Sequence, residues 1–425
     1  MPRLLADITP LRKSHDFRLL YAGQMVSFLG SQLTVVAVPV QVFQLTHSSL
    51  QVGLASLAQL GPLIIGSLAG GSIADAYDRR KLLLVMQVLL AATSVGLALN
   101  AMTRHPAIWP LFVITSLAAG LSGIERPARS AAIPSVLGRD ELPAAYALWQ
   151  ILLQVGAVAG PAVAGLLLTG LGLSAVYWID VLTFGAALVA VAAMRPLPPE
   201  GGGTKVGFAS VAEGLRYLRG RRLLAGTFLI DINAMVFGMP RALFPALGYT
   251  LFNGGSATVG LLYAAPGAGA LVGAVFTGWV ARIRRQGRAV IVAVLIWGVA
   301  IALFGLVPSL PLALAMLAVA GAADVVSAVF RNTILQTTVP DALRGRLSAV
   351  HIAVVTGGPR LGDGESGGVA ALTSPRFSVV TGGLASVAGG LLLAWRIPAL
   401  LRYDARPDED EVEDEAPLSD RDGAV

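Results

Sequence analysis

The chain has 425 residues, of which 55% are hydrophobic and only 13% are charged, and its mean hydropathy is +0.72. Soluble domains carry about 25% charged residues, so this composition indicates a membrane protein and excludes a separate soluble domain of useful size. The net charge of +6 does not favour nucleic-acid binding, because the basic residues lie in short turns beside apolar segments. The absence of cysteine excludes disulfides and thiolate metal sites.

Twelve apolar segments follow one another along the chain, each near the roughly 20 residues that a helix needs to cross a bilayer. They cover residues 17–44, 50–74, 82–102, 107–129, 143–169, 173–194, 223–250, 257–281, 289–307, 310–335, 347–373 and 377–401. Most Lys and Arg residues fall in the connections on one side of the membrane, and the exceptions are Arg104, Arg241, Arg360 and Arg376. The positive-inside rule therefore predicts that both termini are cytoplasmic.

The longest polar connection divides the chain into two halves. Residues 195–222 begin with a proline- and glycine-rich stretch and continue with apolar residues at helical spacing, which predicts a cytoplasmic linker with an amphipathic helix. We expect six-helix bundles over residues 1–194 and 223–402 on either side of it. Residues 403–425 are acidic and lack an apolar run, so a disordered cytoplasmic tail is expected there.

An internal repeat supports this division. Gly66 and Gly71 align with Gly273 and Gly278, and a basic turn follows each pair. Two parallel six-helix repeats are the arrangement of major facilitator transporters. The predicted fold is therefore an all-α membrane protein with twelve transmembrane helices in two pseudo-symmetric bundles.

A charged turn separates the second and third segments. It contains Gly71, Asp75, Asp78, Arg79 and Arg80, and it resembles the signature between helices 2 and 3 of the major facilitator superfamily, with Asp78 where that family usually has glycine. Asp75 ends helix 2 close to the expected start of helix 11, whose positive N-terminal dipole end would attract a carboxylate. We expect Asp75 to hold the two halves together at the cytoplasmic face. The alternative is that these charges only stop translocation of the chain.

The fifth segment carries a second motif. It contains Gly156, Gly160, Pro161 and Gly165, and it resembles the motif that drug–proton antiporters of the superfamily share. Glycines four residues apart let helix backbones touch, and a proline frees a carbonyl, so this helix can pack tightly and bend. Packing without motion is the alternative. Three further stretches, 127–134, 262–266 and 344–348, resemble the branch of the superfamily that contains the enterobactin exporter.

The resemblance covers residues 14–402 and implies an exporter of the bacterial inner membrane, driven by proton exchange, that handles siderophores or bulky hydrophobic compounds. It implies a small-molecule substrate, a surrounding lipid bilayer and no nucleic acid. It also implies no enzymatic activity and no cofactor beyond the proton gradient, and we expect a monomer. Two alternatives stay open, namely a symporter that imports a small solute and a membrane receptor or assembly protein that transports nothing.

Charged residues inside the apolar segments are the candidates for coupling, because charge at the bilayer centre costs several kcal/mol. Asp231 on helix 7 and Asp324 on helix 10 are expected at similar depth, with Asn233 as a neighbouring polar contact. We expect these acids to bind protons or cations in a central cavity. Arg331 lies two turns from Asp324 and could instead neutralise it in a static ion pair.

Further polar residues are candidates for substrate binding. Arg241 is expected near the outer mouth, where it could contact an anionic substrate or simply extend to water. Helix 11 contains so many glycines and charges over residues 357–368 that we expect it to break, with Arg360 pairing locally with Asp363 or Glu365. Asp180 is expected to be hydrated at the membrane surface and without function. Neutral amides that could line the cavity are Gln24, Gln32, Gln150 and Gln154.

Overall fold

The computed structural model describes residues 7–198, 208–275 and 283–404, and these residues form helices and no β-strand. The first half contains α1 (Thr9–Lys13), α2 (His15–Thr46), α3 (Ser49–Ala58), α4 (Leu60–Ala76), α5 (Arg79–Met102), α6 (Ile108–Val136) and α7 (Leu142–Ala192). The linker contains α8 (Phe208–Leu218). The second half contains α9 (Arg222–Phe237), α10 (Phe244–Ala246), α11 (Gly255–Val275), α12 (Gln286–Leu306), α13 (Leu310–Thr338), α14 (Asp341–Leu372), α15 (Pro375–Arg396) and α16 (Pro398–Arg402). Short one-turn helices, η1 (Arg139–Glu141), η2 (Arg241–Leu243) and η3 (Leu247–Leu251), complete the described elements.

The described helices account for twelve membrane crossings, as predicted. Ten helical stretches are long and apolar enough to cross a bilayer. One of them contains two crossings, because the chain reverses inside α7 at Gly172, whose φ of 81° is a conformation that glycine adopts without strain. The remaining crossing is α14, which is 32 residues long and contains more charged residues than any of the ten stretches above.

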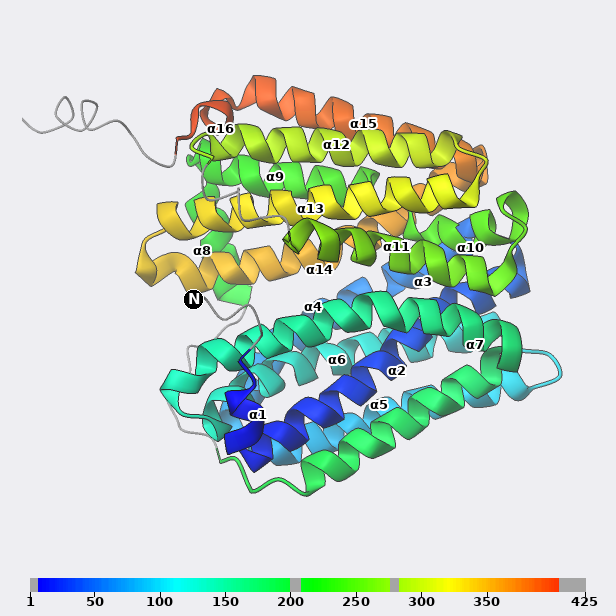
Figure 1. The fold of residues 1–425 in the computed structure, drawn as a ribbon, viewed down its shortest axis with the longest axis vertical. Coiled ribbons are helices and arrows are strands. Elements are labelled where there is room, and N and C mark those ends of the chain that lie inside the picture. The colour runs from blue at the N-terminus through cyan, green and yellow to red at the C-terminus, as the bar shows by residue number, and fades with distance from the viewer. Residues whose placement is uncertain (1–6, 199–207, 276–282, 405–425) are drawn as a thin grey trace, which may run out of the picture.

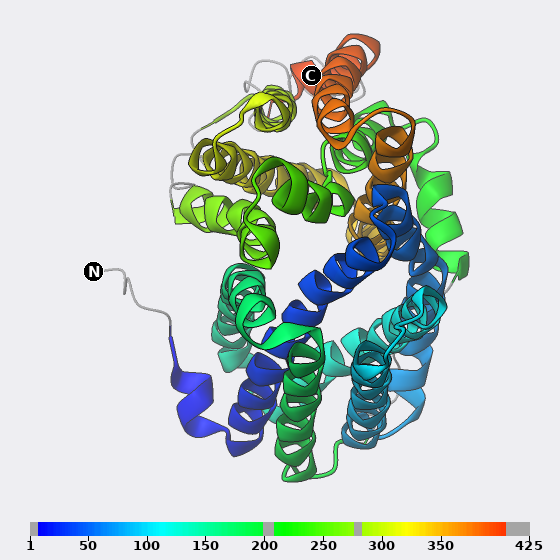
Figure 2. The ribbon, with the colours of Figure 1, turned by 90° about the vertical axis from the view of Figure 1, so that its right-hand side faces the viewer.

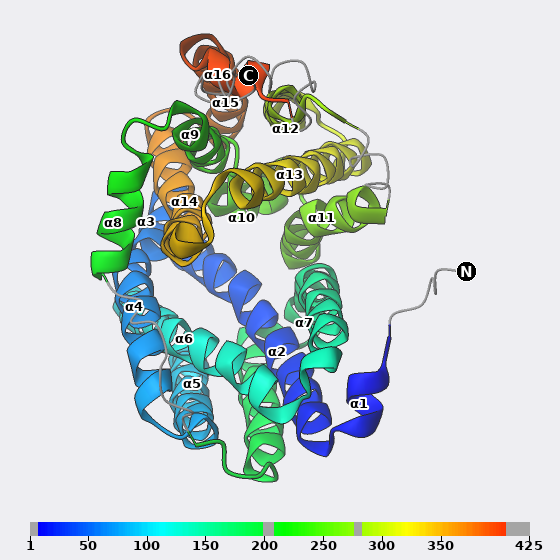
Figure 3. The ribbon, with the colours of Figure 1, turned by 90° about the vertical axis from the view of Figure 1, so that its left-hand side faces the viewer.

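The crossings form two bundles that lie side by side, with α2 to α7 in one and α9 to α16 in the other (Figure 1). We call the end of the bundles that holds α1, α8 and α16 the terminus-side end, and the opposite end the far end. Figures 2 and 3 view the molecule from the far end and from the terminus-side end, respectively.

Apolar packing joins the two bundles towards the far end only. One core cluster mixes residues of both bundles, for example Val40 and Tyr177 from the first with Phe244 and Leu262 from the second. The other clusters of the described residues each belong to a single bundle. Phe17 and Ile133 lie in one of the first bundle, and Phe330 lies in one of the second. The bundles are therefore packed together at the far end and separate towards the terminus-side end.

Side-chain hydrogen bonds between the bundles follow the same division. Gln44 of α2 donates to the Tyr249 hydroxyl at 2.8 Å, and Ser56 of α3 donates to Asp363 of α14 at 2.5 Å. Gln44 lies next to the far end of α2, and Ser56 lies in the far half of its crossing. These bonds reinforce the closure of the far end.

Glycine packing occurs in both halves of the predicted repeat. A Cβ added at Gly66 of α4 would lie 2.1 Å from the Gly120 carbonyl oxygen of α6, and one added at Gly269 of α11 would lie 1.8 Å from that of Ala318 in α13. Each bundle thus presses its second helix onto its fourth through glycine. A Cβ added at Gly273 would lie 2.9 Å from the Cα atom of Ala322, which stands at the same position in α13 as Gly120 does in α6 when each helix is counted from its start. These contacts agree with the predicted alignment of Gly66 with Gly273, and Gly278 lies outside the described residues.

Three crossings differ from their predicted course. Helix α6 continues to Val136, seven residues past the predicted end, because Pro127 and Pro134 are accommodated inside it. Helix α14 runs unbroken through residues 357–368, so the predicted break is wrong. The seventh crossing breaks instead, between α9 and η2 at Met239 and Pro240.

The glycines of α14 serve close packing rather than an irregular backbone. A Cβ at Gly362 would lie 2.4 Å from the Met235 carbonyl oxygen, and one at Gly367 would lie 2.7 Å from the Ser49 carbonyl oxygen. Helix α14 therefore touches α9 of its own bundle and α3 of the other bundle through its backbone. The break in the seventh crossing is compensated by Trp297, whose indole N–H donates to the freed Gly238 carbonyl at 2.7 Å.

The helix α8 lies in the predicted linker. The domain boundaries at residues 194 and 223 stay predictions. The predicted disorder of the tail concerns residues that lie outside the described part of the chain, apart from Tyr403 and Asp404.

Candidate functional site

An ion pair between α9 and α13 lies inside the second bundle. The guanidinium Nη2 of Arg331 is 2.9 Å from Oδ1 of Asp231 and 3.9 Å from Oδ1 of Asp324. The side chains of Arg331 and Asp231 are 7% and 3% exposed, whereas that of Asp324 is 35% exposed. Two carboxylates therefore share one guanidinium group, and the more accessible of them is the more weakly held.

The local sequence explains why α13 presents these groups together. Asp324, Ser327 and Arg331 are three and four residues apart, so they lie on one face of the helix. Ser327 accepts a hydrogen bond from Nη1 of Arg331 at 2.9 Å, which leaves Nη2 directed at α9. The structure thus brings Asp231 and Asp324 together at Arg331, whose closest partner is Asp231 rather than Asp324. Their role in proton coupling stays a prediction.

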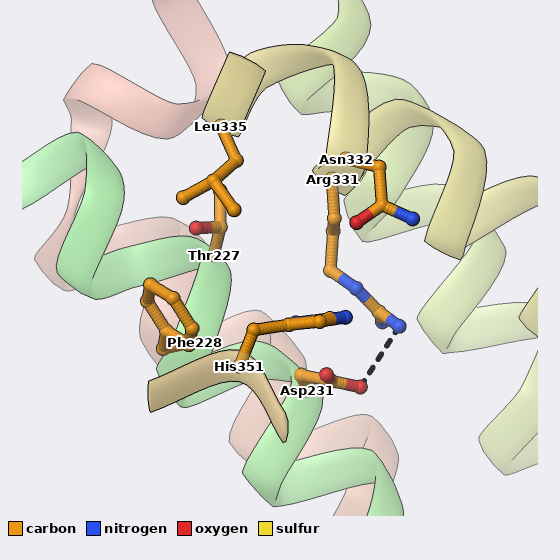
Figure 4. Close-up of a pocket in the computed structure, with 7 residues that line it drawn as sticks. All are labelled: Thr227, Phe228, Asp231, Arg331, Asn332, Leu335 and His351. Carbon is orange, nitrogen blue, oxygen red and sulfur yellow. Dashed lines mark ion pairs between the residues drawn. The ribbon is translucent and has the colours of Figure 1, made fainter. Parts of the chain in front are cut away.

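A small pocket surrounds this ion pair (Figure 4). The imidazole of His351 and the carboxylate of Asp231 both point towards the Arg331 guanidinium group, and His351 packs edge-on against Phe228 with ring centroids 6.3 Å apart. The pocket is lined by Thr227, Phe228, Asp231, Arg331, Asn332, Leu335 and His351. It therefore places a titratable imidazole beside one acid and one arginine, a set that can take up and release protons.

Asn233 does not belong to this cluster, so the predicted contact is wrong. Its amide nitrogen donates to the Ser386 carbonyl of α15 at 2.8 Å. Two residues along a helix differ by about 200° in direction, so Asn233 points away from Asp231. Its role here is to join α9 to α15.

The first bundle contains a second buried ion pair that the sequence analysis missed. Glu125 and Arg129, one turn apart on α6, form a salt bridge, and Gln87 of α5 donates to Glu125 at 2.8 Å. Arg129 also lies 5.7 Å from the ring of Trp149. An acid and an arginine four residues apart on a helix could have indicated this pair. It was missed because the fourth segment was predicted to end at residue 129, which placed Arg129 at the membrane surface.

The two ion pairs occupy equivalent places in the repeat. Helices α6 and α13 are each 29 residues long, and Arg129 and Arg331 stand at the same position counted from the helix start. Arg129 takes its acid from its own helix, whereas Arg331 takes Asp231 from a neighbouring helix. The bundles therefore share a buried arginine and differ in how it is neutralised.

Asp363 and Arg360 do not form the predicted local pair. Asp363 accepts hydrogen bonds from the Ser56 hydroxyl and from the backbone N–H of Ala242 at 2.9 Å. Arg360 donates through Nη1 to the Thr356 carbonyl of its own helix at 2.9 Å. Glu365 is half-buried on the same helix. Asp363 therefore links three crossings at the junction of the bundles.

The glycine and proline motif of the fifth segment lies in the first half of α7, where it contacts two different helices. A Cβ at Gly156 or Gly160 would meet Phe28 or Gln32 of α2 at 2.4 Å and 2.3 Å, respectively. A Cβ at Gly165 would lie 2.8 Å from the Ser256 carbonyl oxygen of α11 in the other bundle. Pro161 contributes its carbonyl oxygen to the same approach, 2.5 Å from a Cβ placed at Gly260. The motif thus packs α7 both within its bundle and across the boundary.

The charged turn between α4 and α5 is tied to its own bundle. Asp78 caps α5 by accepting from the Lys81 backbone N–H at 3.0 Å. Arg79 donates to the Ser135 hydroxyl at 2.5 Å, and Arg80 donates to the Val191 carbonyl at 3.2 Å and to that of Ala192. These two arginines therefore join the ends of three crossings. They do more than stop translocation of the chain, which was the alternative given for the charges of this turn.

Gly71 and Asp75 are half-buried near the end of α4. Asp75 forms no hydrogen bond or ion pair with any side chain that the structure describes, and the side chains of Arg344 and Arg346 at the start of α14 are outside that description. The predicted contact of Asp75 with helix 11 stays a prediction.

The predicted amides lie on the two central helices of the first bundle. Gln24 is buried, Gln32 and Gln154 are half-buried, and Gln150 is exposed. Of the neighbouring hydroxyls on α2, Ser31 donates to the Ser27 carbonyl of its own helix at 2.9 Å, and Thr34 donates to Asp180 at 2.8 Å.

Asp180 is buried rather than hydrated, which corrects the prediction. Its side chain accepts hydrogen bonds from Thr34 of α2 at 2.8 Å and from Ser94 of α5 at 2.7 Å, and the residue is 1% exposed. Because both donors come from other helices, nothing in the local sequence indicated that this acid is enclosed.

Comparisons with known proteins agree with the fold. The profile of the transmembrane secretion effector family matches residues 5–425. The chain is 30% identical over 403 residues to the enterobactin exporters EntS of Shigella boydii serotype 18 and Escherichia coli O139:H28, which covers 95% of this chain and 97% of each relative.

Solved structures show the same fold at low sequence identity. The nucleoside transporter NupG matches with a TM-score of 0.71 and 13% identity, over 91% of this chain and 99% of NupG. A bacterial homologue of the iron transporter ferroportin, in an inward-facing state, matches with a TM-score of 0.69 and 13% identity, over 91% of this chain and 98% of the other.

Proposed function

Because the chain belongs to the transmembrane secretion effector family of the major facilitator superfamily, we propose that this multi-pass membrane transporter exports small molecules from the cytoplasm of a bacterium in exchange for protons. The observation that carries the proposal is that Asp231 and Asp324 share Arg331 inside the second bundle. With both acids ionised, this group has one more negative than positive charge in a medium where net charge is costly. One proton on Asp324 removes that imbalance.

Proton exchange follows from this charge balance. In the proposed cycle, the proton leaves Asp324 while the site is open to the cytoplasm, and substrate binds there. The loaded bundles then rock about their contacts, and protonation from the outside releases the arginine to pair with Asp231 alone. His351 lines the pocket around Asp231 and Arg331 and is suited to pass a proton between water and this charged group.

Alternating access is supported by the uneven contact between the bundles. The far end is closed by the mixed apolar cluster and by the bonds of Gln44 and Ser56, whereas the apolar clusters towards the terminus-side end stay within single bundles. The positive-inside bias assigns the terminus-side end to the cytoplasm of the bacterial inner membrane. The described conformation then corresponds to an inward-open state.

The relatives named enterobactin exporter make enterobactin the first candidate substrate. Other siderophores and bulky hydrophobic compounds are the next candidates, because Gln32, Gln150 and Gln154 offer neutral polar contacts on otherwise apolar helices.

The test is proton flux in vesicles that contain the purified protein and a trapped pH-sensitive dye. Addition of enterobactin should drive proton movement opposite to the substrate, and Asp324→Asn and Asp231→Asn should each abolish it. Asp140→Asn is the matched control, because that acid is exposed in η1, away from the Asp231–Arg331 ion pair. Unchanged coupled flux in both site variants would refute the coupling role, and flux in the same direction as substrate would indicate symport.

A further inference from the structure

Three arginines that lie away from the ends of their crossings have no carboxylate within ion-pair distance among the described residues. They are Arg126 on α6, Arg241 in η2 and Arg360 on α14. The nearby acids are engaged elsewhere, since Glu125 binds Arg129 and Asp231 binds Arg331. Asp363 is held by Ser56 and by the backbone of Ala242.

Arg126 and Arg360 lie well inside the helices that carry them. At 1.5 Å per residue, Arg126 is about 15 Å from the terminus-side end of α6, and Arg360 is about 18 Å from the far end of α14. Arg360 lies one turn before Asp363, whose carboxylate accepts from the backbone N–H of Ala242, next to Arg241. Leu60 and Leu63 lie one turn apart on α4, and they lie against Gly357 of α14 and Gly123 of α6, respectively, each one turn before its arginine. The three arginines therefore lie in one region at the junction of the bundles. That region receives one side chain from the first bundle and two from the second.

Arg126 faces the boundary between the bundles rather than lipid. Val113 and Leu117 form the exposed apolar side of α6 and are 57% and 56% exposed. Arg126 follows Leu117 by nine residues, which is about half a turn of rotation around the helix, so it projects from the opposite side. Helix α6 lies on the side of its bundle that faces the second bundle (Figure 3). The exposed side chain of Arg126 therefore faces the space between the bundles.

Arg360 has unused hydrogen-bonding capacity. Its Nη1 donates to the Thr356 carbonyl, and its Nε is buried without a hydrogen-bond partner. A guanidinium group has five N–H donors in a fixed fork that matches a carboxylate or a similar planar anion. Most of that donor set is available to a ligand.

Clustered positive charge in the membrane interior requires compensation, because each charge there costs several kcal/mol. Asp363, together with Asp324 when it is ionised, supplies two negative charges against the three positive charges of Arg126, Arg241 and Arg360. A bound anion would supply the remainder and satisfy the free donors at the same time. A neutral or cationic ligand would do neither.

We propose that Arg126, Arg241 and Arg360 form the binding site for the anionic group of the transported molecule, so that the substrates are organic anions. This inference rests on the proposed transport function and names its substrate class. Since the arginines come from both bundles, one anion contacts the two bundles at once. Binding therefore favours closure of the terminus-side end over the loaded site.

The proposal is tested by comparing matched anionic and neutral ligands. Benzoate, salicylate and 2,3-dihydroxybenzoate are titrated against the purified full-length protein in detergent, each beside its uncharged amide, with affinity measured by calorimetry. We expect at least one carboxylate to bind ten-fold or more tightly than its amide, and the preference to weaken as salt rises. Equal binding of every carboxylate and its amide, or binding of none, would overturn the proposal.

Substitutions test which arginines cause the tighter binding of the anionic ligand. Arg126→Gln and Arg360→Gln should each remove the preference for the anion, whereas Arg126→Lys should retain part of it because it keeps the charge without the fork. Arg104→Gln is the control, since Arg104 is exposed between α5 and α6 at the far end. An anion preference that survives both glutamine variants would place the site elsewhere.

The hypothesis of an anion site and the hypothesis of proton coupling can be refuted independently of each other. Asp324→Asn should abolish proton flux and leave anion binding in place. Loss of anion preference in Arg126→Gln with intact enterobactin-driven flux would show that the transporter works without this site.

Discussion

Replacing Arg331 with methionine tests whether the ion pair stabilises the second bundle. The substitution keeps much of the side-chain volume and removes the partner of Asp231, whose side chain is 3% exposed and 2.9 Å from the guanidinium group. Removing one partner of a buried pair leaves an uncompensated charge and typically costs about 3–5 kcal/mol. We therefore expect Arg331→Met to lower the free energy of unfolding by that amount.

The double variant identifies the cause. In Arg331→Met with Asp231→Asn the buried charge is gone, so most of the lost stability should return. Unfolding is followed by helical circular dichroism in mixed micelles titrated with dodecyl sulfate, with Arg104→Met as the exposed control. The reasoning would be refuted if the free energy of unfolding of Arg331→Met lay within about 1 kcal/mol of the parent value. It would also be refuted if the double variant were no more stable than Arg331→Met alone.

Three further predictions concern packing, backbone and topology. Gly165→Leu should abolish transport, because a Cβ there would lie 2.8 Å from a backbone oxygen of α11, whereas Gly185→Leu on the same helix meets nothing within 4 Å and should be active in the same vesicle assay. Gly172→Ala should lower the free energy of unfolding in the micelle assay by about 1–3 kcal/mol, because the backbone there has a φ of 81° and a Cβ would meet no other atom within 4 Å. An unchanged free energy of unfolding would contradict this. Since the chain has no cysteine, single cysteines at Arg104 and Asp140 can be labelled in intact cells with a membrane-impermeant maleimide. Only the Arg104 position should react, and labelling at Asp140 alone would invert the topology.

The sequence predicted the architecture well because the bilayer imposes strong rules on it. Apolar length and the distribution of Lys and Arg define the crossings, and they do not depend on which helix packs on which. The convergence of Asp231, Asp324 and Arg331 was accessible for the same reason, since charges in apolar segments are rare enough to stand out.

Helix ends and contacts were harder to predict, because they depend on neighbours that are distant in the sequence. Pro127 suggested an early end for helix 4, which concealed the buried pair of Glu125 and Arg129. The glycines of helix 11 suggested a break, whereas they allow its backbone to approach two other helices. Asp180 looked hydrated because the two shortest hydrogen bonds to its carboxylate come from donors on two other crossings.

The central claim is that substrate leaves in exchange for a proton bound at Asp324, beside the ion pair of Asp231 and Arg331. The most direct measurement follows enterobactin and proton movement together, in vesicles of known protein orientation under an imposed pH gradient. The account predicts that reversing the gradient reverses net substrate movement, with protons moving the opposite way in a fixed ratio. Substrate movement that ignores the gradient, or that has no accompanying proton flux, would contradict it.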